Sequence, residues 1–202
     1  MSFCIGKLKL ELSFPLVALM TAVIIFDTTM SIIVCFIAII LHESGHLIAL
    51  RHYNSFPEKI KLTLFDIAII DNKKYSRSTK DELVVVLAGV LINFISALIF
   101  YILFQYFDLN FFKNMYISNL SLGIFNILPI DTLDGGQALF LIISMKFSIH
   151  CSMIILDIIS FIILVPVACI GFLILLQSKY NFTLLLTSLY LIAIILLKHC
   201  KA

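Results

Sequence analysis

The chain has 202 residues, of which 62% are hydrophobic and 13% are charged, and its mean hydropathy is +1.14. A soluble domain is usually about half apolar, so a single core could not bury this much apolar surface, and the bilayer must act as part of the solvent. The five cysteines form no C-x-x-C pair, which indicates neither a disulfide framework nor a thiolate metal site. The net charge of +2 says little about partners, and no nucleic-acid partner is expected.

Apolar segments of spanning length recur along the whole chain. A spanning helix needs about 20 mostly apolar residues, and six segments are expected to cross the membrane: residues 8–26, 30–50, 82–107, 117–147, 153–176 and 182–197. The fourth is interrupted by polar residues, proline and glycines, so we expect one discontinuous span there. A re-entrant hairpin over residues 117–147 is the alternative. The fold class that follows is an all-α polytopic membrane protein with about six transmembrane helices.

The basic residues test this topology. With six crossings, every lysine and arginine except Lys113 and Lys179 falls on one side of the membrane. The positive-inside rule makes that side cytoplasmic, so both termini are expected in the cytoplasm and the chain in a bacterial cytoplasmic membrane. Between the second and third spans, residues 59–70 alternate in part between polar and apolar. This pattern predicts a strand or a small β-hairpin at the cytoplasmic membrane surface.

The sequence His42-Glu43-Ser44-Gly45-His46 lies inside the second expected span. Positions i and i+4 of a helix share a face, so both imidazoles can reach one metal ion, and Glu43 lies where it can take a proton from bound water. A charged group inside a spanning helix costs about 2.5–3.5 kcal/mol on insertion scales. The cluster therefore favours a zinc site over a buried polar cluster that only joins helices.

A catalytic zinc site normally needs a third protein ligand, with water in the fourth position. The other histidines and aspartates lie at expected membrane borders or off the ligand face, which leaves Asp131 and Asp134. Both belong to residues 126–137, where Pro129 ends a helix and the two glycines after Asp134 permit a tight turn. Unwound backbone at membrane depth is tolerated only where protein or a water-filled cavity satisfies it. The break is thus a candidate binding site, with an ordinary loop as the alternative.

These motifs resemble the site-2 protease family of intramembrane zinc metallopeptidases. The resemblance rests on the His42–His46 sequence, on Asn-x-x-Pro-x-x-x-Leu-Asp-Gly-Gly at residues 126–136, and on Ala-Gly-Val-Leu-Ile-Asn at residues 88–93. The last is similar to the family's Ala-Gly-Pro-x-x-Asn stretch, with Val90 in place of proline. The match covers about residues 8–148. It is closest to the minimal branch of the sporulation protease that processes a membrane-tethered pro-sigma factor.

The resemblance implies a zinc metalloendopeptidase that cuts in or next to a transmembrane segment. It implies His42, His46 and Asp134 as zinc ligands and Glu43 as the catalytic base. Asn126 is expected to hold substrate or the developing oxyanion, and Asn93 is given a similar substrate-binding role. The expected organisation is a protease core over residues 1–148 followed by two additional transmembrane helices over residues 149–202, with no PDZ or regulatory domain.

The implied partners are the lipid bilayer and a membrane-protein substrate, such as a single-span protein, a peptide precursor or a membrane-tethered transcription factor, with regulatory membrane proteins beside them. An extended substrate segment is expected to pair with the 59–70 strand, unless that strand is only a surface hairpin. Two other functions stay open: a membrane zinc-binding or transport protein, and an inactive relative that only binds membrane helices. The first gives no reason for a glutamate directly after the first histidine.

Overall fold

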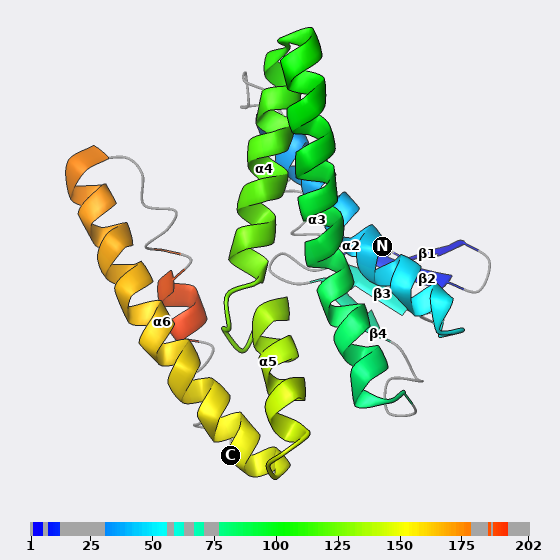
Figure 1. The fold of residues 1–202 in the computed structure, drawn as a ribbon, viewed down its shortest axis with the longest axis vertical. Coiled ribbons are helices and arrows are strands. Elements are labelled where there is room, and N and C mark those ends of the chain that lie inside the picture. The colour runs from blue at the N-terminus through cyan, green and yellow to red at the C-terminus, as the bar shows by residue number, and fades with distance from the viewer. Residues whose placement is uncertain are drawn as a thin grey trace. The chain divides into compact units, whose positions relative to one another are not determined.

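The computed structural model describes residues 2–5, 8–12, 31–55, 59–62, 67–70, 77–178, 186 and 188–193. The chain forms two compact units, Met1–Ile124 and Phe125–Ala202 (Figure 1).

The first unit holds a four-stranded sheet in the order β1-β2-β3-β4. Its strands are β1 (Ser2–Ile5), β2 (Leu8–Leu12), β3 (Lys59–Leu62) and β4 (Ile67–Ile70). β1 and β2 are antiparallel, β2 and β3 are parallel, and β3 and β4 are antiparallel with Lys59 opposite Ile70. β3 and β4 lie in the segment expected to form a strand or hairpin. Residues 63–66 between them lie outside the described part.

The start of the first expected span needs a correction. Residues 8–12 were assigned to a transmembrane helix, but they form β2, which pairs with strands on both sides. The run Leu-Lys-Leu-Glu-Leu alternates apolar and charged residues, which is the period of a strand with two different faces. Residues 13–30, the rest of that span, lie outside the described residues.

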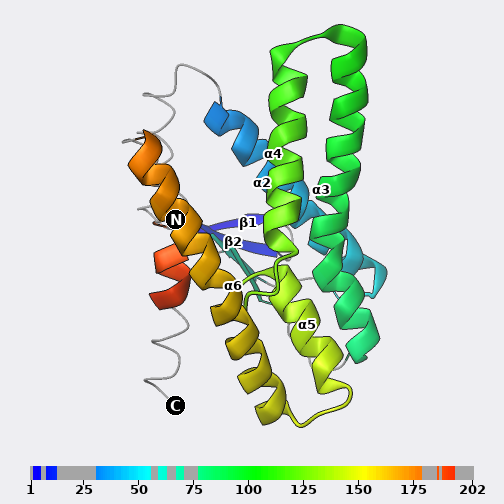
Figure 2. The same cartoon turned by 60° about the vertical axis from the view of Figure 1, so that its left-hand side comes forward.

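The first unit also contains α2 (Ser31–His52), α3 (Thr79–Phe107) and all but the last two residues of α4 (Asn110–Asn126). Ser78 caps α3, since its hydroxyl accepts the Asp81 N–H at 3.2 Å and donates to the Asp81 carboxylate at 2.7 Å. Asp108 ends α3 in the left-handed conformation, with φ of 47°. The chain then turns directly into α4, which runs beside α3 (Figure 2).

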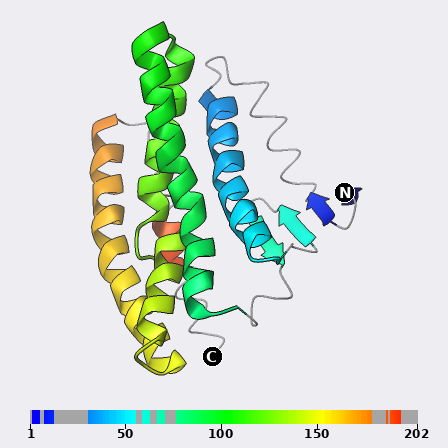
Figure 3. The same ribbon diagram turned by 45° about the vertical axis from the view of Figure 1, so that its right-hand side comes forward.

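α2 and α3 pack against each other closely (Figure 3). A Cβ placed on Gly45 would lie 2.6 Å from the Ala88 carbonyl oxygen and 2.9 Å from Gly89 Cα, so only glycine permits this approach of the two backbones. Toward the cytoplasmic end expected for α2, Ala49 and Leu50 pack against Val85 of α3. The close contact places side chains of α2 directly against the backbone of α3.

A buried ion pair joins the region after α2 to the start of α3. The Arg77 guanidinium lies 2.7 Å from the Glu82 carboxylate, and their side chains are 7% and 11% exposed. Arg77 also donates a 2.7 Å hydrogen bond to the hydroxyl of the buried Ser55. The arginine therefore links the residues that follow α2 to the first turns of α3.

The second unit contains α5 (Asp134–Ser144), α6 (Ile149–Ser178) and a helical stretch at residues 186 and 188–193. α5 and α6 pack side by side. The core of this unit is formed by Ile130 from the loop before α5, Leu164 from α6 and Leu191 from the last helical stretch. The loop before α5 is therefore anchored by the helices that follow it.

Three helices in the described part are long and apolar enough to cross a membrane, at Ile33–His52, Thr79–Phe107 and Ile149–Leu173. They correspond to the second, third and fifth expected spans. Their outer faces carry exposed leucines and isoleucines, among them Leu91 at 59% and Ile162 at 64%, as expected where lipid covers the surface. The expected interruption is present, since α4 ends at Asn126 and α5 begins at Asp134. The sixth expected span falls mostly outside the described residues, and the count of six stays a prediction.

Candidate metal centre

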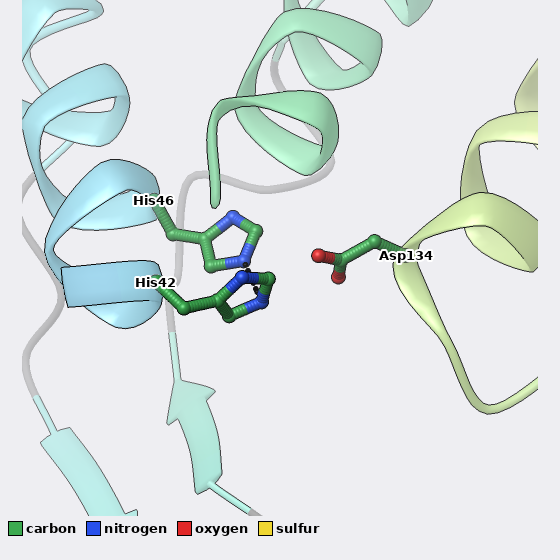
Figure 4. Close-up of side chains that lie close together, drawn as sticks. All are labelled: His42, His46 and Asp134. Carbon is green, nitrogen blue, oxygen red and sulfur yellow. Dashed lines mark hydrogen bonds between the residues drawn. The ribbon is translucent and has the colours of Figure 1, made fainter. Parts of the chain in front are cut away.

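His42 and His46 lie one helical turn apart on the face of α2 that meets α3. Their rings are edge to face, at 83° with centroids 4.8 Å apart. The two Nε2 atoms approach to 3.2 Å, as the dashed line in Figure 4 marks. His42 is buried at 6% exposure. Two nitrogens with lone pairs held this close repel each other unless a proton or a cation lies between them.

The other nitrogen of each ring is held by α3. His46 Nδ1 lies 2.9 Å from the Val85 carbonyl oxygen. A carbonyl only accepts, so the His46 proton sits on Nδ1 and the Nε2 lone pair faces His42. His42 Nδ1 lies 3.1 Å from the carboxamide of Asn93. Both imidazoles are thus anchored on one side and present Nε2 on the other, which is the usual arrangement of metal-binding histidines.

The supporting groups follow a single stripe of α3. Val85, Gly89 and Asn93 are spaced by four residues and therefore share one face of the helix. A Cβ on Gly89 would overlap His46 Nε2 and lie 2.8 Å from His42 Cε1. Gly89 therefore leaves the space that the two rings occupy. The glycine was part of the expected 88–93 motif, but the role of the Val85 carbonyl has no signal in the sequence, because any residue offers a backbone carbonyl.

Asn93, given a substrate-binding role by the resemblance, lies on the same stripe of α3 as Val85 and Gly89. Its side chain is fully buried, at 0% exposure, and faces His42. The substrate-binding role expected for Asn93 stays a prediction. Glu43 follows His42 directly and is partly buried, one step round the helix from the two imidazoles.

The interrupted segment between α4 and α5 lies in the second unit. Asp134 is the first residue of α5, so its carboxylate lies at a helix N-terminus, where negative charge is stabilised (Figure 4). The backbone path of this segment requires glycine at both positions after Asp134. A Cβ on Gly135 would overlap the Ile127 carbonyl, and one on Gly136 would overlap the Ile130 carbonyl. The loop folds back over the first turn of α5 and fixes where that turn begins.

α6 holds the same loop from the other side. The hydroxyl of Ser160 accepts the Asp131 N–H at 3.0 Å and donates to the Pro129 carbonyl oxygen at 3.4 Å. Backbone groups freed by a break in a membrane helix must find such partners. Ser160 is fully buried, at 0% exposure. A single serine in an apolar helix carries no recognisable pattern, so the sequence does not predict a role for Ser160.

Asn126 is the last residue of α4 and is partly buried. It precedes the unwound residues, eight positions before Asp134. The described structure thus places Asn126 and Asp134 at the two ends of the interruption, and the His pair on α2 against α3. These features define a membrane protein with an intramembrane His-Glu-x-x-His helix and a discontinuous helix.

Comparison with known proteins agrees with this class. Residues 105–168 match the sequence profile of Peptidase family M50. The chain is 33% identical over 121 residues to zinc metalloprotease MJ0392 of Methanocaldococcus jannaschii, covering 57% of this chain. It is also similar to the solved structure of the site-2 protease from Methanocaldococcus jannaschii, with a TM-score of 0.67, 29% identity, and coverage of 95% of this chain and 92% of that one.

The chain is thus similar to peptidase family M50 and to a solved site-2 protease. It is an integral membrane protein. The aligned region amounts to only 34% of the length of the curated metalloprotease.

Proposed function

We propose that this protein is an intramembrane zinc metalloendopeptidase, which hydrolyses a peptide bond in or next to a transmembrane segment of another membrane protein. The observation that carries the proposal is the separation of 3.2 Å between His42 Nε2 and His46 Nε2. A tetrahedral zinc with Zn–N bonds of about 2.0–2.1 Å sets its nitrogen ligands about 3.3 Å apart. The pair therefore fits two corners of one zinc site.

Asp134 is proposed as the third ligand. Each of the three residues offers one suitable atom, an imidazole nitrogen from His42 and His46 and a carboxylate oxygen from Asp134. Two histidines and one carboxylate are a donor set found in catalytic zinc sites, which keep a fourth position for water. Similarity to a curated zinc metalloprotease supports the same metal.

Zinc bound there supplies a Lewis acid that makes water a nucleophile near neutral pH. Glu43 accepts a proton from the water that attacks the scissile carbonyl and then passes it to the leaving amine of the cleaved peptide bond. Asn126 donates its side-chain N–H to the oxyanion that develops on the carbonyl oxygen, a contact that strengthens in the transition state.

The substrate must present an extended backbone, since the carbonyls of an intact helix are already hydrogen-bonded. Within the described sheet, β4 is an edge strand, and an unpaired edge can accept one more strand. We propose that a substrate segment pairs there. The substrates are single-span proteins, peptide precursors or membrane-tethered transcription factors, with membrane proteins as regulators.

The proposed setting is a bacterial cytoplasmic membrane crossed six times, with both termini and the sheet on the cytoplasmic side. The distribution of basic residues supports this orientation. Residues 1–148 form the protease core, and the two helices of residues 149–202 are additional. Water and cleavage are then expected near the cytoplasmic face, because the His pair precedes the cytoplasmic end of α2 by only a few turns.

The test is a cleavage assay in proteoliposomes with a single-span substrate, combined with zinc analysis. In Glu43→Gln, cleavage should fall at least about 100-fold, because a general base typically contributes 10²–10⁴-fold, while zinc stays bound. His46→Ala should lose zinc. Ser44→Ala is the control, since the Ser44 hydroxyl donates only within its own helix, at 2.6 Å to the Leu41 carbonyl.

Each alternative predicts a different result. A zinc carrier would bind zinc in the wild type and in Glu43→Gln, and neither protein would cut any substrate. An inactive relative would likewise leave every single-span substrate intact. Equal cleavage by the wild type and Glu43→Gln would refute the assigned base.

A further inference from the structure

Asn93 is a fully buried polar side chain inside an apolar helix, at 0% exposure. Its Nδ2 atom lies 3.1 Å from His42 Nδ1. Its other polar atom, Oδ1, has no hydrogen-bond partner among the described residues. A buried carbonyl oxygen without a hydrogen-bond partner lowers the stability of the fold by about 1–3 kcal/mol. The groups around Asn93 are therefore the place to look for a role of this oxygen.

The two ends of a carboxamide have nearly the same shape, and the groups around them decide which end faces which partner. If Nδ2 faces the ring, His42 Nδ1 accepts, and the imidazole proton must sit on Nε2. That nitrogen then has no lone pair for a metal. If Oδ1 faces the ring, the proton sits on Nδ1 and the Nε2 lone pair becomes available. The second arrangement gives Oδ1 a partner and turns Nδ2 to the place that Oδ1 left.

We propose that Asn93 is a positioning residue of the metal site, and that its Oδ1 accepts the Nδ1–H of His42 when zinc is bound. The Val85 carbonyl performs the same task for His46 at 2.9 Å. One stripe of α3 would then fix the tautomer and the orientation of both ligands on α2. This inference rests on the proposed zinc site, and it replaces the substrate-binding role expected for Asn93.

A matched control exists on α4. Asn119 is also at 0% exposure, and its Oδ1 likewise has no hydrogen-bond partner among the described residues. Its Nδ2 donates to the Met115 carbonyl of the same helix at 2.8 Å. Asn93→Leu and Asn119→Leu remove the same chemical group at the same burial, but only the first removes a contact with a histidine.

The experiment measures zinc affinity by competition with a chromophoric chelator, in detergent-solubilised Glu43→Gln protein so that no cleavage intervenes. Asn93→Leu should bind zinc about 10–100-fold more weakly, the usual effect of losing a group that supports a metal ligand. Asn119→Leu should stay within about threefold of its parent. Asn93→Asp keeps an acceptor oxygen and should retain affinity to within about threefold. Thermal unfolding checks that each variant is folded.

The possible results test the proposed zinc site and the proposed role of Asn93 separately. Failure of the parent protein to bind zinc would refute the proposed function. Zinc binding by the parent together with equal affinity in Asn93→Leu would refute the role of Asn93. The same conclusion would follow if a folded Asn93→Asp lost as much affinity as Asn93→Leu, or if Asn119→Leu weakened zinc equally, because then packing rather than the acceptor would matter.

Discussion

Gly89 lies directly beneath the two imidazoles, and its missing side chain is the space they occupy. We predict that Gly89→Ala weakens zinc binding about 10–100-fold, by analogy with other changes that displace metal ligands. The new Cβ would overlap His46 Nε2 and crowd His42 Cε1, so at least one ring must turn away. Chelator competition measures the effect.

Gly123→Ala is the control for this prediction. A Cβ there would lie 3.4 Å from Asn93 Cβ and from Phe94 Cε1, which a small adjustment can accommodate. Alanine also raises the intrinsic stability of a helix by about 1 kcal/mol relative to glycine, so neither variant should unfold for local reasons. Unchanged zinc affinity in Gly89→Ala would show that the rings do not need this space.

At the residue scale, the sequence predicts those candidate site residues whose type and spacing indicate their chemistry. The i, i+4 histidines with Glu43 between them, and an aspartate beside paired glycines, are recognisable because each is costly inside a membrane. The role proposed for Asn93 could not be inferred in this way. Whether a buried carboxamide faces substrate or a histidine depends on how α2 packs on α3, and that packing depends on contacts such as Gly45 on Ala88.

At the scale of elements, α6 is part of the machinery that shapes the interrupted segment. Ser160 binds the Asp131 N–H and the Pro129 carbonyl. We predict that Ser160→Ala lowers stability by about 1–3 kcal/mol, the cost of leaving buried polar groups unpaired, and lowers cleavage about tenfold, because the loop that leads to Asp134 becomes less rigid. Thermal unfolding and the proteoliposome assay measure the two effects.

Ser152→Ala provides the comparison on the same helix. Ser152 is equally buried, at 0% exposure, but its hydroxyl donates at 2.9 Å to the carbonyl of Ser148, the residue directly before α6. Its loss should leave cleavage near the wild-type rate. If the two alanine variants behaved alike, the contact between α6 and the loop would have no special part in the site.

The helices were easier to predict than the sheet. α2, α3 and α6 are long apolar runs, and their expected bounds lie within a few residues of the observed ones. Leu8–Leu12 was expected to be helical because it adjoins an apolar run, whereas it pairs in parallel with Lys59–Leu62. That pairing joins segments about 50 residues apart, and no local pattern specifies such a partner.

At the scale of the whole molecule, the interrupted segment decides the number of crossings. α4 has 17 residues and α5 has 11, which correspond to roughly 25 and 16 Å of helix at about 1.5 Å per residue. Neither alone spans a hydrocarbon core of about 30 Å, whereas the two in succession would. One broken span puts Lys113 and Lys146 on opposite sides of the membrane, and a re-entrant hairpin puts them on the same side.

Cysteine labelling distinguishes these topologies. Lys113 and Lys146 are both exposed, so each can be replaced by cysteine in a background in which the native cysteines are changed to serine. For one broken span, a membrane-impermeant maleimide added to intact cells should label Lys113→Cys, and should label Lys146→Cys only after permeabilisation. Lys80→Cys, at the cytoplasmic start proposed for α3, should behave like Lys146→Cys. Labelling of Lys113→Cys and Lys146→Cys alike in intact cells would establish a hairpin and refute the six-span topology, because the basic residues would no longer share one side.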